Sequence, residues 1–427
     1  MNLLWTNRNF LLLFIGRIVT NIGDSIYYVA AMWLVYDLGG SAFYSGLAGF
    51  LTLLPAALQF FTGPFVDKWP IKKVLVLTQL LQCILILIIP LAHWIGFLTV
   101  HLILTIMPVV AFIEQFTYPS QTKALVSILS KQQLVKGNSL FAFAYQGIDL
   151  LFNAVSGILV AIVGAVTLYL ADSMTFALAA ILFTICKFLP GEEKNNEKAS
   201  IKQTFLDYKS ELKQGFSIVF RSLLASFLIG SVACNFAIGA GLAVLPGLGA
   251  ELGGAEIYGF YLAAMSTGSL LGALTSTFFG RFPVGKLSIL TFFFGSCCWV
   301  ASTFLSPVLL GAVFFGLAWV PVGATNVLFA AVMQSVVPIH LLGRVNTVSR
   351  SMSASAMPIG SLAGGYLAST FSPSLIFSCA GAGLLIVAIV WICHPRLRQL
   401  PKTDGMTAET FDLPITIPKR SLEGPSS

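Results

Sequence analysis

Ionisable side chains inside long apolar segments are the residues of this chain best suited to chemistry. In the first apolar segment, polar side chains recur at i, i+4, i+7 and i+11, which places them on one face of a helix. They are Arg17, Asn21, Asp24 and Tyr28. At the centre of a membrane helix, an Asp or Arg costs about 2.5–3.5 kcal/mol. Such groups therefore indicate a functional site in which each has a polar partner.

Three further apolar segments carry an acid, and in two of them the acid is a candidate for chemistry. Glu114 lies in one, and the other places three polar side chains on one helical face at i, i+3 and i+7: Gln146, Asp149 and Asn153. Carboxyl groups removed from water favour the neutral form, and neighbouring ones compete for protons. The pattern predicts a cavity that binds protons and a solute. A purely structural ion pair between Arg17 and one of the acids is the alternative.

No constellation typical of an enzyme accompanies these residues. The chain has neither an HExxH zinc motif nor a GxSxG nucleophile elbow. The stretch from Gly280 to Leu287 resembles a phosphate-binding loop, but Leu287 replaces the hydroxyl that would bind Mg²⁺. The seven cysteines stand singly or adjacent in apolar runs, as buried hydrophobes do. We expect no enzymatic activity, no metal and no cofactor, with protons as the coupling ion.

The composition identifies the surroundings of these residues. Hydrophobic residues make up 57% of the 427 positions and charged residues 10%, and the mean hydropathy is +0.88. A soluble domain carries roughly a quarter charged residues, so lipid must cover most of this surface. The net charge of +7 is explained by its distribution along the chain, which excludes nucleic acid as a partner. The chain is predicted to be a polytopic membrane protein.

Twelve continuous apolar segments are each long enough to cross a bilayer, which takes about 20 residues per helix. Such segments are expected to be helices, because lipid cannot form hydrogen bonds with the backbone and a helix satisfies them internally. They are 10–36, 43–64, 74–95, 98–122, 137–163, 167–189, 222–247, 257–279, 287–304, 307–336, 346–370 and 373–393. Lys and Arg fall in the even-numbered connections and the tail, and the odd-numbered connections contain none. This asymmetry predicts a multi-pass protein of the cell membrane with both termini in the cytoplasm.

The two halves of the chain repeat one another. At an offset of 213 residues, Gly40 falls on Gly253, Gly46 on Gly259 and Lys73 on Lys286. Six segments per half preserve orientation, so the repeat is parallel. We expect an N-terminal six-helix bundle (1–189), a cytoplasmic linker with an amphipathic helix (190–221), a C-terminal six-helix bundle (222–395) and a disordered tail (396–427).

The connection after the second segment reads GPFVDKWPIKK from Gly63 to Lys73. It resembles the GxLADRxGRR signature of the major facilitator superfamily, and other stretches are similar to its bacterial exporter branch, which includes macrolide-efflux and siderophore-exporter proteins. The resemblance implies an all-α membrane protein with twelve transmembrane helices in two six-helix bundles. Pro70 and Ile71 depart from the signature, and the antiporter signature of the fifth helix is degenerate.

The resemblance also implies a cytoplasmic gate between the loop after the second helix and the start of the eleventh. Its acid is expected to meet helix amides near 345–349. The gate residues are Gly63, Asp67, Lys68, Lys72, Lys73 and Arg344.

The C-terminal half contributes no acid inside a segment. Its polar candidates, Asn235 and Asn326, suit substrate contact and helix-packing hydrogen bonds equally. For Asp172, in the sixth segment, the pattern favours a packing hydrogen bond over a coupling role.

Three acids against one arginine favour a cationic or weakly basic solute. The sequence therefore predicts a secondary transporter that acts as a monomer by alternating access. It is expected to export an amphiphilic organic compound, such as a cationic or macrolide-like drug, in exchange for protons. Export of a native metabolite or siderophore is the alternative within transport. A transport-inactive scaffold or receptor is the alternative outside it.

Overall fold

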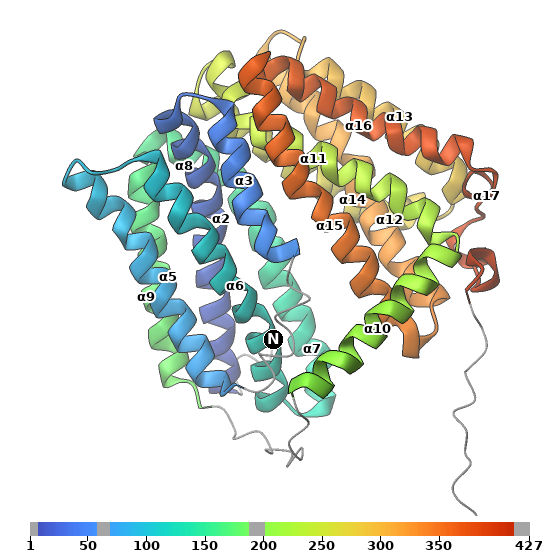
Figure 1. The fold of residues 1–427 in the computed structure, drawn as a ribbon, viewed down its shortest axis with the longest axis horizontal. Helices are drawn as coiled ribbons and strands as arrows, with labels where there is room; N and C mark the ends of the chain where they lie inside the picture. The colour runs from blue at the N-terminus through green and yellow to red at the C-terminus, as the bar shows by residue number, and fades with distance from the viewer. Residues whose placement is uncertain (1–6, 58–68, 188–200, 414–427) are drawn as a thin grey trace, which may run out of the picture.

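The computed structural model describes residues 7–57, 69–187 and 201–413, and these residues form two bundles of helices (Figure 1). The N-terminal bundle contains α2 (Arg8–Gly39), α3 (Ala42–Ala57), α5 (Ile71–Trp94), α6 (Val100–Ile128), α7 (Lys131–Ala142), the π-helical turn η2 (Phe143–Gly147), α8 (Ile148–Val163) and α9 (Ala165–Ile185). The linker helix is α10 (Ile201–Arg221). The C-terminal bundle contains α11 (Leu224–Leu252), α12 (Ala255–Phe279), α13 (Val284–Ser302), α14 (Val308–Val336), α15 (Ile339–Thr370) and α16 (Pro373–Cys393).

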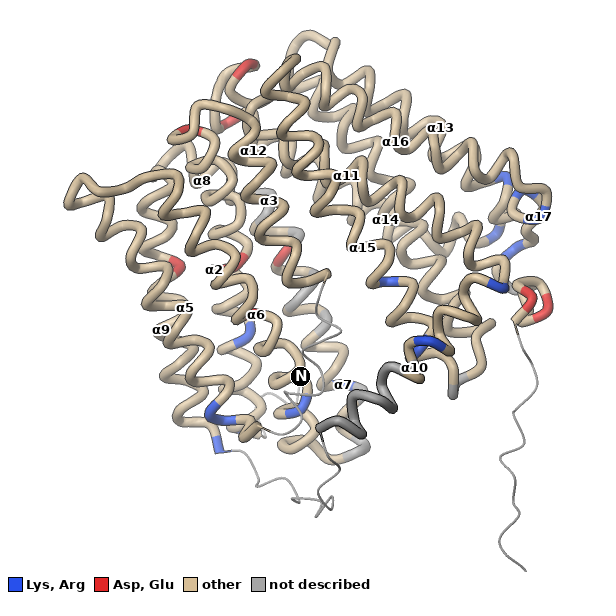
Figure 2. The backbone as a smooth tube through the Cα atoms, in the orientation of Figure 1, with Lys and Arg blue, Asp and Glu red and all other residues tan. Residues whose placement is uncertain are grey.

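Nine of the described helices are long and apolar enough to cross a membrane: α2, α5, α6, α9, α11, α12, α13, α14 and α16. The three remaining predicted segments fall on α3, whose described part ends at Ala57, on α7 to α8, which η2 interrupts, and on the serine-rich α15. The predicted all-helical membrane fold is confirmed. Figure 2 shows most of the basic positions at the lower end of the N-terminal bundle and toward the right-hand end of the C-terminal bundle.

Local signals in the sequence set the helix ends. Asn7 caps α2, because its Oδ1 accepts a hydrogen bond from the amide of Phe10 at 3.0 Å. The helix stops at Gly40, whose φ of 63° suits a residue without a side chain. Thr99 caps α6 in the same manner, accepting from the amide of Leu102. These caps determine where the two helices that carry Arg17, Asp24 and Glu114 begin.

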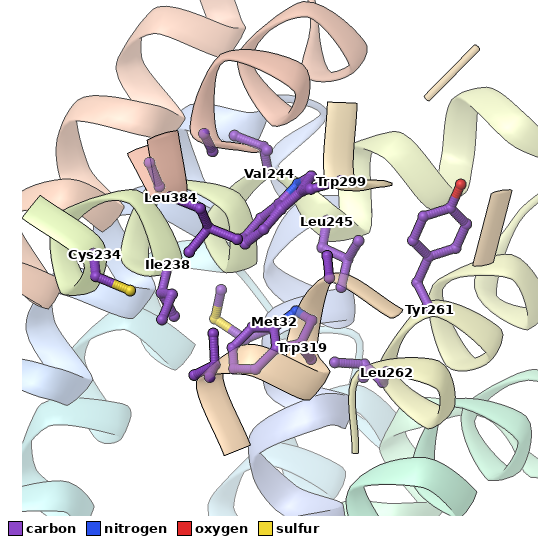
Figure 3. Close-up of a cluster of buried hydrophobic side chains, with 14 of the residues drawn as sticks. Met32, Cys234, Ile238, Val244, Leu245, Tyr261, Leu262, Trp299, Trp319 and Leu384 are labelled. Carbon is purple, nitrogen blue, oxygen red and sulfur yellow. The ribbon is translucent and has the colours of Figure 1, made fainter. Parts of the chain in front are cut away.

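The two bundles share a hydrophobic core at one end only. We call the end where α2 joins α3 and α11 joins α12 the distal end, and the opposite one the proximal end. The larger buried cluster takes residues of α2 only from Ile26 onward and combines them with the C-terminal bundle. Figure 3 shows part of it, with Met32 among side chains of the C-terminal helices. At the proximal end the N-terminal bundle has a separate cluster around Phe10, Phe14 and Phe183.

Glycines bring the two bundles into close backbone contact at the distal end. Gly46 of α3 lies against Gly365 of α15, where a Cβ on Gly46 would come within 2.6 Å of the Gly365 Cα. Gly157 of α8 lies against Gly259 of α12, where the corresponding distance is 2.0 Å. The Ser361 hydroxyl adds a hydrogen bond to the carbonyl of Gly46 at 3.0 Å. Backbone-to-backbone packing of this kind holds membrane helices together closely.

Residues 395–413 fold against the proximal end, so the prediction of a disordered tail is wrong for this part, and 414–427 lie outside the described residues. We call 395–413 the strap; it contains α17 (Pro395–Arg398) and the short turns η3 (Thr403–Gly405) and η4 (Glu409–Phe411). Its apolar side chains are buried, including Leu397 and Phe411. The backbone of the strap also accepts hydrogen bonds from the amides of Leu223 and Val284 at 3.1 Å. The prolines and the lack of a core-forming apolar run predicted disorder, but spaced apolar residues anchor the segment.

Replacing Phe411 by alanine is expected to destabilise the C-terminal bundle. The ring is 3% exposed, and removing a buried Phe side chain costs about 3–5 kcal/mol. Thermal unfolding of the purified protein in detergent measures the loss as a lower melting temperature. The exposed neighbour Glu409 provides the control, because Glu409→Ala removes no buried contact. Equal melting temperatures for both variants would show that the strap carries no stability.

Candidate functional site

A cavity of about 220 Å³ lies within the N-terminal bundle and collects the acids predicted from the sequence. Its walls come from four helices, α2, α3, α6 and α8. The lining residues are Asn21, Asp24, Ser25, Tyr27, Tyr28, Thr52, Val110, Ala111, Glu114 and Asp149. The three carboxyl groups thus share one space, and the described residues that line it all belong to the N-terminal bundle. Figure 2 shows acidic positions in the interior of the N-terminal bundle, away from most basic ones.

Arg17 lies beside this cavity and is 1% exposed. Its guanidinium donates a hydrogen bond to Oδ1 of Asn21, and its charge acts on all three cavity acids. The structure therefore adds Asn21, one turn along the same helix, to the partners expected for Arg17. A buried guanidinium beside three carboxyl groups can neutralise at most one of them. Protons or a bound cation must balance the others.

The π-helical turn positions the fourth wall. The side-chain amide of Asn21 donates through Nδ2 to the carbonyl of Ala144 in η2 at 2.9 Å, which ties the turn to α2. A π turn inserts one residue and so redirects the helix that follows, and such turns are frequent at functional sites. Here α8 begins immediately afterwards and brings Asp149 to Ser25, whose hydroxyl donates to Oδ1 of Asp149 at 2.7 Å. The π-helical turn, with its wider hydrogen-bond spacing, could not be predicted from the sequence.

Ser25 and Tyr27 are cavity residues that the sequence did not single out as sites. Ser25 follows Asn21 by one helical turn, so the periodicity of the first polar face contained this signal. Tyr27 lines the cavity and its ring meets the ring of Tyr169 edge-on, with centroids 5.4 Å apart. Thr52 of α3 also lines the cavity, and no charge or spacing in its segment marked it.

The structure places the other predicted residues elsewhere. Asn235 of α11 donates to the carbonyl of Ser231 and to the hydroxyl of Ser353 in α15, both at 2.9 Å, so its amide serves helix packing in this arrangement. Asn326 of α14 is exposed and does not line the cavity. For Gln146 in η2 and Asn153 in α8 the structure describes the backbone alone.

The predicted gate is described only in part. Gly63, Asp67 and Lys68 lie outside the described residues, and Lys72 and Lys73 are exposed in the first turn of α5. The helix start was misplaced, because α15 begins at Ile339 and residues 345–349 lie inside it. Their amides bond within the helix, so the free amides of a helix terminus are nearer Ile339.

Arg344, the remaining gate residue, instead donates to Oε1 of Gln214 in α10 at 2.5 Å. This contact connects the linker helix to α15.

Comparisons with known proteins agree with this architecture. A family model described as "Transmembrane secretion effector" matches residues 5–420. The chain is 28% identical to the uncharacterized MFS-type transporter YvqJ of Bacillus subtilis over 93% of this chain and 94% of that protein. It is 24% identical to the multidrug efflux pump Tap of Mycolicibacterium fortuitum over 91% and 96%. A shorter match, 31% identical over 43% and 46%, relates it to the enterobactin exporter EntS of Shigella boydii.

Solved structures show the same fold at low sequence identity. The nucleoside transporter NupG matches with a TM-score of 0.66 and 12% identity, over 90% of this chain and 98% of that one. A bacterial homologue of the iron transporter ferroportin, in an inward-facing state, matches with a TM-score of 0.65 and 16% identity over 90% and 98%. The helical architecture, the cavity inside one bundle and the match along nearly the whole chain lead to one conclusion: the protein belongs to the transmembrane secretion effector family of major facilitator superfamily transporters.

Proposed function

We propose that this transporter exports an amphiphilic, cationic or weakly basic organic compound in exchange for protons, and that it does so as a monomer. The observation that carries the proposal is the set of three carboxyl groups, Asp24, Glu114 and Asp149, on one cavity with one buried arginine beside them. Such a site attracts a cation and holds protons in its absence. The rings of Tyr27 and Tyr28 offer apolar and cation–π contacts to the same solute.

The distribution of contacts supports alternating access. The bundles pack closely at the distal end, where Gly46 meets Gly365 and Gly157 meets Gly259. With both termini in the cytoplasm, as the charge pattern predicts, the distal end faces outward, and its close packing closes this arrangement on the outer side. A solute from the cytoplasm enters in this state. Separation of the glycine pairs then opens the opposite side.

The cation and the protons cannot occupy the cavity acids at the same time, and this competition couples solute export to proton entry. A bound cation stabilises the ionised carboxylates and favours release of their protons, and loss of the cation favours proton uptake. Each turnover then carries the solute outward and protons inward. A charge moving across the membrane gains about 2.3 kcal/mol per 100 mV, which suffices to concentrate a solute outside.

The decisive experiment measures ethidium transport in inside-out membrane vesicles that contain the protein. We expect ethidium uptake when a proton gradient is applied, its loss when nigericin collapses the gradient, and no uptake by vesicles without the protein. A parallel panel with macrolides and other dyes defines the range of solutes. Ethidium transport that ignores the gradient would refute proton coupling. Absence of flux for every compound would favour the scaffold or receptor alternative.

Export of a native siderophore or metabolite is the second candidate. It is favoured by the similarity to an enterobactin exporter over 43% of the chain. A siderophore bears acidic groups, and three acids on the cavity oppose that charge, so we place this candidate second. A catecholate siderophore added to the ethidium assay tests this candidate. If the siderophore binds the same site, it inhibits ethidium uptake; if it does not, ethidium uptake is unchanged.

The gate also remains a proposal, and it predicts that Asp67→Asn shifts the resting population further toward the cytoplasm-open state and slows transport. The helix dipole stabilises a carboxylate near a helix N-terminus by about 0.3–2 kcal/mol, and the neutral amide of asparagine loses this stabilisation. Reactivity of cysteines introduced at the cytoplasmic mouth reports the shift as faster labelling. Labelling at the rate of the parent protein would remove Asp67 from the gate.

A further inference from the structure

A fourth acid, Asp172 of α9, lies behind the cavity that holds the other three and is 1% exposed. It sits against the backbone of α2, because a Cβ on Gly23 would come within 2.1 Å of its Oδ1 and within 2.2 Å of the Thr175 hydroxyl. Gly23 directly precedes Asp24. The absence of a side chain at residue 23 therefore brings the carboxyl group of Asp172 up to the helix that carries the cavity acid.

The hydrogen bonds around Asp172 are incomplete. The Thr175 hydroxyl lies 3.1 Å from Oδ1 and 2.7 Å from the Asp172 carbonyl, and its single proton serves one of them at a time. Among the described residues, Oδ2 of Asp172 and the hydroxyls of Tyr27 and Tyr169 have no hydrogen-bond partner. Buried polar atoms are normally paired, and an unpaired buried carboxylate is especially unfavourable. Three unmatched atoms in one cluster indicate that a proton belongs there.

Within the described part of the chain, the charged groups that face Asp172 do not supply a counter-ion. Glu114 of α6 and Asp24 of α2 are acids whose charges act on this region. The other titratable neighbours are Tyr27 and Tyr169, and Cys83 of α5, none of which carries positive charge. Arg17 lies about two turns from Asp24 along α2 and donates to Asn21. A neutral, protonated Asp172 fits these surroundings, whereas a carboxylate does not.

Tyr27 connects this acid to the cavity. It lines the cavity, its ring packs edge-on against Tyr169, and among the described residues its buried hydroxyl has no hydrogen-bond partner. We infer that Asp172 is a second proton-binding residue of the transporter and that it reloads Asp24 through the Tyr27 hydroxyl, a role that rests on the proposed proton exchange. In this step the Tyr27 hydroxyl, which has no partner in the present arrangement, first moves into hydrogen-bond contact with both acids. Asp172 then gives its carboxyl proton to the Tyr27 oxygen, and Tyr27 gives its own hydroxyl proton to the Asp24 carboxylate. One proton moves and Tyr27 is unchanged, while Asp172, left as a carboxylate, takes a new proton from the outer side before the next turnover.

Infrared difference spectroscopy of the purified protein at neutral pH tests the protonation of Asp172 without any solute. The Asp172→Asn variant should lose one carbonyl-stretch band of a protonated carboxylic acid. The Thr175→Ala variant, which keeps the acid and removes its hydrogen bond, should retain that band at a shifted frequency. It also serves if Asp172→Asn fails to fold. Protonated-acid bands identical to those of the parent protein in both variants would overturn the inference.

Transport of ethidium in vesicles tests the relay. Tyr27→Phe keeps the ring on the cavity and removes the hydroxyl, so the ratio of gradient-driven export to ethidium exchange without a gradient should fall at least about tenfold relative to the parent protein. Normal gradient-driven export by Tyr27→Phe would exclude the relay. If the parent protein itself ignores the gradient, the proposed function fails, and the infrared result still decides whether Asp172 holds a proton.

Discussion

Asp24→Asn is expected to abolish gradient-driven export of ethidium, down to the level of membranes without the protein, while downhill exchange continues. Asparagine has nearly the same shape as aspartate, so the cavity keeps its form, but an amide cannot bind and release a proton. Asp24 lies on the wall that α2 presents to Glu114 and Asp149, where a change of charge on one acid alters proton binding on the others. Transport with and without a pH gradient, in the same vesicles, separates coupling from binding.

The control is Asp37→Asn, which alters an exposed acid at the distal end of the same helix and should leave both activities unchanged. Asp149→Asn and Glu114→Gln complete the series, and we expect each to weaken coupling. Normal gradient-driven transport in all three cavity variants would mean that coupling resides elsewhere in the protein.

Gly259→Leu is expected to prevent closure of the distal end. A Cβ at Gly259 would lie 2.6–2.8 Å from backbone atoms of Gly157 and Ile158. Backbone cannot rotate away as a side chain can, so α8 and α12 must separate. The arrangement seen here then becomes inaccessible, and turnover should fall at least about tenfold, equivalent to ~1.4 kcal/mol in the barrier. Spin-label distances between the distal ends of α8 and α12 should lengthen.

Gly343→Leu is the matched control, because a Cβ at this position of α15 meets no atom within 4 Å. It should give the parent distance distribution. An unchanged distribution in Gly259→Leu, together with normal turnover, would show that the glycine contact is not needed for closure.

The polar face of α2 was predictable because residues on one helical face recur every three or four positions. Asp24 and Tyr28 line the cavity as that periodicity suggested. The neighbours of these residues were not predictable in the same way. The π turn that aims Asp149, and the approach of Gly23 to Asp172, depend on how α2 meets α8 and α9. Such tertiary contacts leave no repeat in a single sequence.

Segment ends were also harder to predict than segment cores. The eleventh segment was expected from residue 346, but α15 begins at Ile339, because the polar first turns of a helix carry no apolar pattern. The strap illustrates the opposite error. Its polar and proline-rich composition concealed Leu397, Leu400 and Phe411, which are buried by contact with the bundle rather than by a core of their own.

The strap has a consequence for biosynthesis. It joins Leu223, at the beginning of the C-terminal bundle, to Phe411, close to the end of the chain. Domains generally fold as units during synthesis, with the N-terminal one first. This bundle, however, cannot make its final contacts until the strap has left the ribosome. A chain truncated after α16 would insert its helices and still leave the ends of α11 and α13 without their covering segment, exposed to membrane quality-control proteases.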